Sequence, residues 1–351
     1  MRILIVTQKI DINDSVLGFF HRWVAEFSKH FELVTVICLQ KGQFDLPSNV
    51  KVLSLGKEKK ASRFWYFFNF YKYILQERKH YDLVFVHMNQ EYIFLGWKIW
   101  KFLGKKILLW RNHKKGNIFT RLAVAMSDQV FCTSVGSFTA QFKKTKLMPV
   151  GIDSNFFSMM PEIRKIPRSI LFLGRISPVK HLDVLIQSLE ILHSRGENFQ
   201  AYIYGRPTPA DSGYFKKIKD EAEELEKIGK LFFRDEVANT KTPVIYNEHE
   251  IFVNLTDSGS FDKTIIEAML CGTLVLVSNW SLKDILEPQF FFKHNDPVDL
   301  AEKLIFMLAL SQTDKKKLSE NLRLRAQKHS LEKLVGELKP AMELLLFRDD
   351  I

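Results

Sequence analysis

The sequence is poor in cysteine and contains no long hydrophobic run. Its 351 residues include three cysteines, Cys38, Cys132 and Cys271, which lie far apart and show no ligand spacing with the histidines. We therefore expect neither a disulfide framework nor a zinc site, and we interpret the cysteines as small buried residues. No apolar stretch reaches the roughly 20 residues of a membrane-spanning helix, and the apolar run in residues 1–10 is too short for a signal peptide. We expect a cytoplasmic protein.

Acidic residues are scarce in the N-terminal half. Residues 1–160 contain 24 Lys and Arg but 11 Asp and Glu, whereas residues 161–351 contain 27 and 29. The net charge of +11 therefore originates in the first half. Two interpretations stay open: an anionic partner, either a phospholipid surface or a polyphosphate, or basic residues that keep an unusually aromatic half in solution.

Short apolar runs alternate with helical patterns along the chain. This alternation predicts α/β domains with buried parallel sheets. The length of 351 residues and the hydrophobic content of 46% exclude a disordered chain or a coiled coil. A proline-bracketed loop segment interrupts the alternation at about 152–167. We predict two Rossmann-like domains, residues 1–155 and 156–330, and we expect the helical tail at about 331–351 to return to the first domain.

The expected elements place the candidate motifs. Strands are expected at 2–7, 169–173, 200–204 and 251–254, and helices at 179–194 and 213–227. In such a protein the ligand belongs at the carboxyl ends of the strands, where helix N-termini present free amides to anions.

Gly174, Arg175 and Lys180 form the first strong motif. Gly174 and Arg175 follow a predicted strand, and Lys180 falls in the first turn of the next predicted helix. A cation in that turn opposes the helix dipole, so it needs a compensating anion. Arg175 and Lys180 can flank a diphosphate. The alternative is a solvated pair of cations at the rim of a cleft.

The segment 257–277 is the most specific motif. It reads as a strand end, a turn of small residues at Ser258–Ser260, a helix, Gly272 and a buried strand. Glu267 lies one turn beyond Lys263 in an otherwise apolar helix, so its carboxylate needs hydrogen-bond donors, and a ribose diol can provide them. A salt bridge to Lys263 is the alternative.

These residues resemble the GT-B glycosyltransferases of the large retaining family 4, and the resemblance covers essentially the whole chain. The matching segments, in the family's order and spacing, are Pro149–Asp153 with Phe157, Gly174-Arg175 with Lys180, and Phe261 with Glu267–Gly272. The resemblance implies an α/β protein of the GT-B class, with two Rossmann-like domains that face each other across a cleft. It also implies a nucleoside-diphosphate sugar of the UDP or GDP type as donor, held mainly by the C-terminal domain.

The resemblance implies roles for individual residues. Arg175 and Lys180 would bind the diphosphate, Glu267 the ribose hydroxyls, and the amides of residues 260–264 the phosphate or the sugar. The expected donor-binding residues are Gly18, Gly174, Arg175, Lys180, Ser260, Phe261, Asp262, Lys263, Thr264 and Glu267.

The chain departs from the family at Gly259. Family members usually carry a first glutamate eight residues before the position of Glu267, and this glutamate commonly contacts the transferred sugar. Either another group, such as Asp262 or Lys263, holds the sugar here, or the enzyme is altered. Asp262 itself replaces a common glycine.

The N-terminal half also resembles the family. The sequence from Gly18 to His21 is similar to the family's glycine loop, with the usual glycine pair reduced to Leu17-Gly18. His113 follows a predicted strand at 106–110 and matches the histidine that contacts the donor sugar in family members, with His87 as the second candidate. The expected catalytic residues are therefore His113, Arg175 and Lys180.

The expected reaction uses neither a metal nor a cofactor. No Asp-x-Asp sequence follows a strand to hold a divalent ion, so Arg175, Lys180 and helix amides would meet the charge on the departing nucleoside diphosphate. The resemblance implies a retaining transfer of a hexose, in which the acceptor hydroxyl attacks on the face of the leaving phosphate.

The acceptor is less well indicated. Residues 62–80 and 92–106 combine aromatic side chains with Lys and Arg, as in segments bound to anionic membranes, yet they also fall where helices should cover the sheet. We expect a glycan or lipid-linked acceptor of cell-envelope polysaccharide or glycolipid synthesis, and peripheral contact with the inner face of the membrane stays open. A non-catalytic GT-B protein that binds nucleotide or glycan is the alternative. A nucleic-acid-directed transferase ranks last, because no stacking motif or basic reader helix occurs, and no nucleic acid partner is expected.

Overall fold

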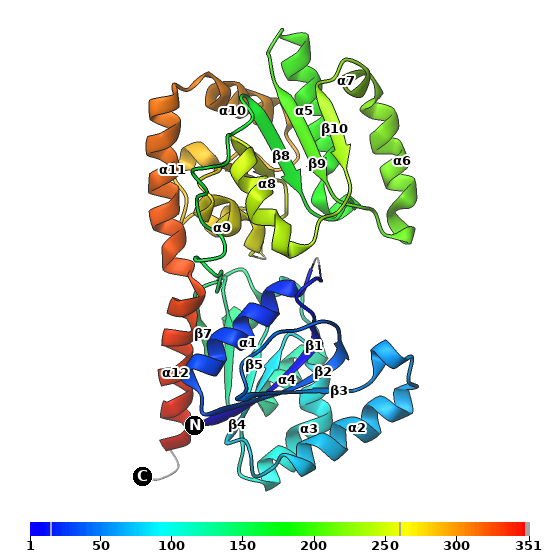
Figure 1. Ribbon diagram of the computed structural model, residues 1–351, viewed down its shortest axis with the longest axis vertical. Helices are drawn as coiled ribbons and strands as arrows, with labels where there is room; N and C mark the ends of the chain where they lie inside the picture. Colours follow the sequence, from blue (N-terminus) through cyan, green and yellow to red (C-terminus); the bar gives the residue numbers. More distant parts are fainter. Residues whose placement is uncertain (15, 260, 348–351) are drawn as a thin grey trace. The chain divides into compact units, whose positions relative to one another are not determined.

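The computed structural model describes residues 1–14, 16–259 and 261–347, which form two compact units (Figure 1). Unit 1 comprises Met1–Gly151 and the segment from Ser330 onward, and unit 2 comprises Ile152–His329. The C-terminal helix α12 (Leu331–Phe347) packs against α1 (Gly18–His30), so the tail returns to the first unit as the sequence predicts.

Unit 1 is built on a seven-stranded parallel sheet with the order β3-β2-β1-β4-β5-β6-β7. Its strands are β1 (Arg2–Ile10), β2 (Leu33–Lys41), β3 (Val50–Ser54), β4 (Leu83–His87), β5 (Lys106–Trp110), β6 (Gln129–Cys132) and β7 (Thr145–Leu147). Successive residues of a strand face opposite sides of the sheet. Ile3 and Ile5 therefore belong to one core cluster, and Leu4 and Val6 to the other.

Helices cover both faces of this sheet. The cluster of Ile3 and Ile5 includes buried residues of α1 and α12. The cluster of Leu4 and Val6, on the second face of the sheet, includes buried residues of three helices. These are α2 (Arg63–Gln76), α3 (Glu91–Phe102) and α4 (Ile118–Met126). This is the doubly covered parallel sheet that the continuous apolar runs predict.

Unit 2 contains a five-stranded parallel sheet with the order β10-β9-β8-β11-β12. Its strands are β8 (Ser169–Leu173), β9 (Gln200–Tyr204), β10 (Leu231–Arg234), β11 (Ile251–Asn254) and β12 (Leu274–Val277). Its α-helices are α5 (Leu182–Ser194), α6 (Ser212–Glu221), α7 (Glu223–Lys227), α8 (Thr242–Glu248), α9 (Lys263–Leu270), α10 (Pro297–Ala309) and α11 (Gln312–Ala326). Helix α5 packs against α10, and α9 packs against α8 and α11.

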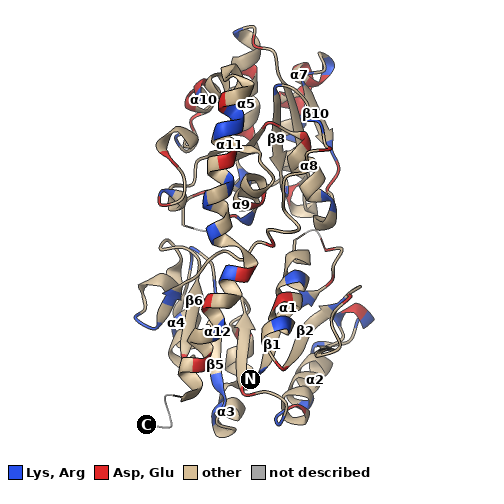
Figure 2. Ribbon diagram, turned by 60° about the vertical axis from the view of Figure 1, so that its left-hand side comes forward, with Lys and Arg blue, Asp and Glu red and all other residues tan. Residues whose placement is uncertain are grey.

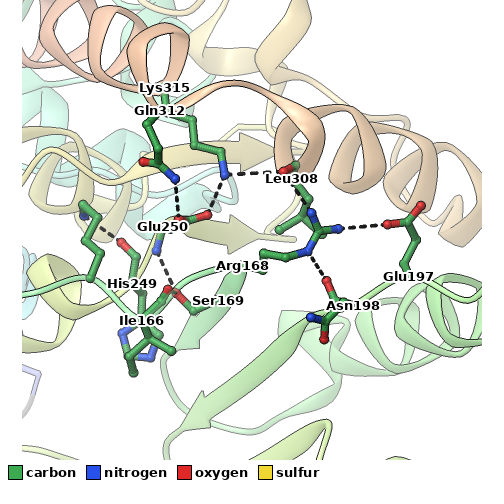
Figure 3. A network of polar contacts seen from close by, with 11 residues as sticks. Ile166, Arg168, Ser169, Glu197, Asn198, His249, Glu250, Leu308, Gln312 and Lys315 are labelled. Atoms are coloured by element: carbon green, nitrogen blue, oxygen red, sulfur yellow. Dashed lines mark hydrogen bonds and ion pairs between the residues drawn. The ribbon is translucent and has the colours of Figure 1, made fainter.

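A polar network closes the amino edge of this sheet (Figure 3). The Glu250 carboxylate, which precedes β11, pairs with Lys315 Nζ of α11 at 2.7 Å, and both side chains are at most 10% exposed. The Glu250 amide donates to Ser169 Oγ at the start of β8. Arg168 pairs with Glu197 at 2.9 Å and also donates to the Leu308 carbonyl. The polar groups at the amino ends of these strands are therefore bound to one another.

Three of the elements named above differ in their bounds from the sequence prediction. Strand β1 continues to Ile10, because Lys9 and Ile10 pair with β2 and Ile10 is buried. The helix expected at 179–194 begins at Leu182, since Pro178–Lys180 forms a 3₁₀ turn and His181 adopts φ +47°. The helix expected at 213–227 divides at Ala222, where ψ is −3°.

Candidate functional site

The loops after β8 and β9 form the floor of the carboxyl edge in unit 2. The Gly174 amide donates to the Tyr204 carbonyl at 3.0 Å, and the Ile176 amide donates to the Arg206 carbonyl at 3.1 Å. A Cβ on Gly205 would lie 1.9 Å from the Gly174 carbonyl oxygen, so this position requires glycine. Gly205 is a structural requirement of the motif that sequence reasoning missed, although a glycine directly after a strand could have signalled it.

Arg175 follows Gly174 and is exposed. Within the described part of the chain its guanidinium forms no ion pair or hydrogen bond with protein groups. Its fork of donors is therefore available to an anion.

Lys180 is not in the first turn of an α-helix, which corrects the sequence prediction. It ends the 3₁₀ turn Pro178–Lys180, and its Nζ pairs with Asp262 Oδ2 at 2.7 Å. Their side chains are 25% and 13% exposed. The anion that this cation needs is thus provided within the protein, by a residue that sequence reasoning placed beside the sugar.

Asp262 organises the start of α9. Its Oδ1 accepts a hydrogen bond from Thr264 Oγ1 at 2.7 Å and another from the Thr264 amide at 3.3 Å, and its Oδ2 accepts one from Asn254 Nδ2 at 3.1 Å. Burial favours the neutral acid, but the Lys180 ammonium and these hydrogen bonds outweigh it and lower the pKa of Asp262 to about 2. The carboxylate is therefore ionised at neutral pH.

The amides at the start of α9 are partly occupied. The Thr264 amide already donates to Asp262, so it differs from the free donor that the sequence predicts. The Phe261 ring lies 5.8 Å from the His329 ring, between centroids. Lys263 begins the helix, and Ser260, the remaining predicted residue of this turn, lies outside the described residues.

Glu267 is buried in α9 with 4% of its surface exposed. Tyr246 of α8 donates its hydroxyl hydrogen to Glu267 Oε2 at 3.1 Å, which fits the expectation that this carboxylate accepts hydrogen bonds. Burial and the charge of Glu267 raise the pKa of Tyr246 well above its usual value, so the hydroxyl remains a donor. Tyr246 is a partner that sequence reasoning missed.

The loop before α9 is tied to the loop after β12. The Gly259 amide donates to Ser281 Oγ at 2.7 Å, and the Trp280 amide donates to Ser258 Oγ at 2.9 Å. Gly259 has φ +107°, a region that L residues rarely adopt. The position where the resemblance expects the family's first glutamate is therefore a glycine whose backbone conformation a glutamate would rarely adopt.

The predicted residues of unit 1 lie at the start of α1 and in the loop after β5. Gly18 begins α1 and donates its amide to the Asp14 carbonyl at 3.1 Å, while Asp14 Oδ2 pairs with Lys9 Nζ at 2.6 Å. His113 is exposed after β5, and its Nδ1 lies 3.0 Å from both the amide and the carbonyl oxygen of Lys115.

His87, the second candidate histidine, belongs to the core. It is 3% exposed and stacks on Phe20 at 4.0 Å between ring centroids, with Nδ1 3.3 Å from Thr7 Oγ1. His113 is therefore the more accessible of the two candidates.

Comparison with known proteins identifies the class of this fold. The family Glycosyl transferases group 1 matches residues 158–329. Mannosylfructose-phosphate synthase of Agrobacterium fabrum is 27% identical over 148 residues, which cover 39% of this chain and 33% of that protein. The chain thus matches about a third of the length of this relative.

Solved structures resemble the chain over nearly its full length. The Anabaena protein HepE in complex with UDP and glucose gives a TM-score of 0.77 at 17% identity, covering 98% of this chain and 99% of that one. Sucrose-phosphate synthase of Thermosynechococcus elongatus gives 0.75 at 15% identity, with 98% and 99% covered. At these identities the likeness shows the fold, which is the GT-B class expected from the sequence.

Proposed function

Residues 158–329 form a glycosyl transferases group 1 domain in a chain of GT-B fold, and on this premise we propose that the protein transfers a hexose from a UDP- or GDP-sugar to an acceptor hydroxyl. The observation that carries the proposal is the convergence of Lys180, Asp262 and the loop of Gly174 and Arg175 at one edge of the unit 2 sheet. HepE, which has the same fold, binds UDP and glucose.

The diphosphate is the group that this edge suits best. Arg175 offers an unengaged fork, and Lys180 offers an ammonium whose counter-ion is Asp262. A diphosphate that approaches Lys180 either replaces Asp262 or shares the ammonium with it. The two cations would then stabilise the charge that develops on the departing nucleoside diphosphate.

Two further contacts would orient the donor. Glu267, held by the Tyr246 hydroxyl, would accept hydrogen bonds from the ribose diol. The α9 start at Phe261, Asp262 and Lys263, together with Thr264, would face the phosphate or the sugar. In unit 1, Gly18 would allow the backbone to come close to a phosphate. The exposed His113 would form a hydrogen bond with the sugar or the acceptor.

We propose a metal-independent, retaining reaction. Arg175 and Lys180 supply positive charge where an Asp-x-Asp site would hold a divalent ion, and the sequence contains no Asp-x-Asp. The acceptor hydroxyl would attack on the face of the leaving phosphate, which can accept its proton. No group of the protein then needs to act as a nucleophile.

The acceptor is proposed to be a glycan or a lipid-linked sugar of cell-envelope polysaccharide or glycolipid synthesis. Helix α2 supports contact with an anionic inner membrane face. Phe70 and Ile74 are buried, but Phe64 and Trp65 are 71% and 51% exposed, and the charged residues within the helix, Arg63 and Lys72, are both basic (Figure 2). None of the described helices is both long and apolar enough to cross a membrane.

A second function, nucleotide or glycan binding without turnover, is favoured by Gly259. The glutamate that commonly contacts the sugar in the family is missing, and the φ of +107° would strain a glutamate placed there. Product formation from radiolabelled UDP- and GDP-hexoses with a panel of glycan and lipid acceptors separates the two. Turnover supports the transferase, whereas saturable nucleotide binding without product supports the binding protein.

A further inference from the structure

Two histidines and an aspartate from three different loops converge at the carboxyl edge of the unit 2 sheet. His181 precedes α5, Asp257 follows β11, and His294 follows β12 and its bridge partner Phe291. The Nε2 atoms of both histidines lie 3.1 Å from the same oxygen, Asp257 Oδ1. All three donor atoms lie within 4.8 Å of one another.

We propose that His181, Asp257 and His294 form a Zn²⁺ site. In tetrahedral zinc sites the metal lies about 2.0–2.1 Å from imidazole nitrogens and about 2.0–2.2 Å from carboxylate oxygens, so neighbouring donors are about 3.3 Å apart. The two distances of 3.1 Å from Asp257 to the histidines need to change by a few tenths of an ångström. The side chains are 23%, 54% and 39% exposed, which leaves room for water as a fourth ligand.

Hydrogen bonds of the backbone hold the segments that carry the two histidines without the ion. The His181 amide donates to the Pro178 carbonyl at 3.1 Å. The residue before His294, Lys293, donates its amide to Asp299 Oδ2 at 2.7 Å. The imidazole planes of His181 and His294 are inclined at 86°, with centroids 4.9 Å apart, so the rings approach the carboxylate from different directions. Such preorganisation reduces the entropy that metal binding must overcome.

The donor set selects the class of metal. Two imidazoles and one carboxylate suit Zn²⁺ and its spectroscopic substitute Co²⁺, whereas Mg²⁺ and Ca²⁺ prefer oxygen ligands. Cys38, Cys132 and Cys271 are all buried, so thiols do not compete for the ion in the folded protein. The expectation of no zinc site rested on cysteine spacing. It could not detect ligands that meet from positions 181, 257 and 294.

The ion would join the loops that follow β8, β11 and β12. His181 directly follows Lys180, and Asp257 lies two residues before Gly259. Binding would therefore add a link between the loop that carries Lys180 and the loop that carries Asp262. This consequence rests on the proposed function, whereas the site itself stands on the geometry of its three side chains.

The test is Zn²⁺ binding to the purified, metal-stripped full chain at about neutral pH, measured by competition with a chromogenic chelator. We expect one ion per chain, and a weakening of affinity by at least about 100-fold in each of His181→Ala, Asp257→Asn and His294→Ala. Co²⁺ should give the visible absorption of a tetrahedral site in the wild type and lose it in the variants. Mg²⁺ and Ca²⁺ should not displace it.

His80→Ala is the matched control. His80 pairs with Glu77 at 3.1 Å and is 55% exposed, so it is a surface histidine beside one carboxylate without a second imidazole. This variant should bind Zn²⁺ as the wild type does. Far-ultraviolet circular dichroism verifies that each variant is folded.

Two results would overturn the proposal: no stoichiometric Zn²⁺ binding by the wild type, or unchanged affinity in any one of the three ligand variants. Because the assay contains no sugar nucleotide, its failure is distinguishable from failure of the proposed transferase activity.

Discussion

The Lys180 ammonium lies 2.7 Å from Asp262 Oδ2, although 82 residues separate the two in the sequence. This ion pair joins the loop after β8 to the N-cap residue of α9. Because Asp262 is ionised at neutral pH, Lys180 has a counter-ion before any substrate arrives. A diphosphate that binds Lys180 as proposed would have to compete with the Asp262 carboxylate for the same cation.

Arg175 has no such competitor among the described residues, so its loss should affect the reaction directly. We predict that Arg175→Ala and Lys180→Ala each lower turnover by about 10²–10³-fold, the scale for removing one stabiliser of developing negative charge. Lys227→Ala is the control, since that exposed residue pairs with Glu223 within α7. Near-native turnover in both Arg175→Ala and Lys180→Ala would show that the diphosphate binds elsewhere.

Asp262 should stabilise the fold through its lowered pKa. Its pKa falls from 3.8 to about 2 on folding, so its contribution is fully present above pH 3.8 and is lost as the pH falls toward 2. We predict that Asp262→Asn lowers the free energy of unfolding by about 2 kcal/mol. Urea unfolding of both proteins should show the same difference at every pH from about 5 to 8. If the difference in unfolding free energy between the two proteins vanishes within this pH range, the lowered pKa of Asp262 is not its source.

The sequence predicted the central strands of unit 2 well because each is a short apolar run. The bounds of β8, β9 and β11 agree with the runs at 169–173, 200–204 and 251–254. The predicted position of Lys180 in a helix was wrong. His181 adopts a left-handed conformation, so α5 begins only at Leu182, and no local sequence pattern indicates this.

Contacts between distant segments could not be predicted. The partners of Lys180 and Glu267 are Asp262 and Tyr246, which only the folded sheet and helices bring near. The aromatic residues of 62–80 were ambiguous for the same reason. Their composition does not say which ones, such as Phe70, face the sheet and which face solvent.

Glu267 provides a test of ribose recognition. We predict that Glu267→Gln, which keeps the shape but loses the charge, weakens binding of the nucleoside diphosphate by about 1.5–3 kcal/mol, the range for hydrogen bonds to charged groups. Tyr246→Phe is the companion variant, because it removes the donor to Oε2 and keeps the carboxylate. If Glu267 instead serves a salt bridge with Lys263, Lys263→Ala and Glu267→Gln should cost similar stability and leave affinity unchanged.

His249 should make unit 2 sensitive to mild acid. It is fully buried, its Nδ1 lies 2.7 Å from the Ile245 carbonyl oxygen, and burial lowers its pKa from 6.5 to about 4. The neutral ring is therefore favoured on folding, and this stabilisation is complete above pH 6.5 and is lost as the pH falls toward 4.

We predict that between pH 7 and pH 5 the wild type loses about 2 kcal/mol more unfolding free energy than His249→Asn, which keeps a donor for Ile245. Urea unfolding at the two pH values measures the loss. Equal losses in the two proteins would show that His249 is not the source of the sensitivity to acid.

The transfer reaction should not require Mg²⁺ or Mn²⁺. With Arg175 and Lys180 at the diphosphate, turnover of protein passed through EDTA should match turnover with either ion added. Activity that disappears in EDTA and returns with Mn²⁺ would contradict the metal-independent reaction. The proposed Zn²⁺ site does not alter this reading, because Mn²⁺ is a poor substitute at a site with two imidazoles.

Calorimetric titration of UDP and of GDP into the wild type and into Lys180→Ala tests most directly whether the carboxyl edge of unit 2 holds a nucleoside diphosphate. We expect saturable binding of one nucleotide per chain, with affinity reduced by about 10- to 100-fold in the variant, which corresponds to one hydrogen bond to a charged group. Absence of binding to the wild type, or equal affinity in the two proteins, would contradict this expectation.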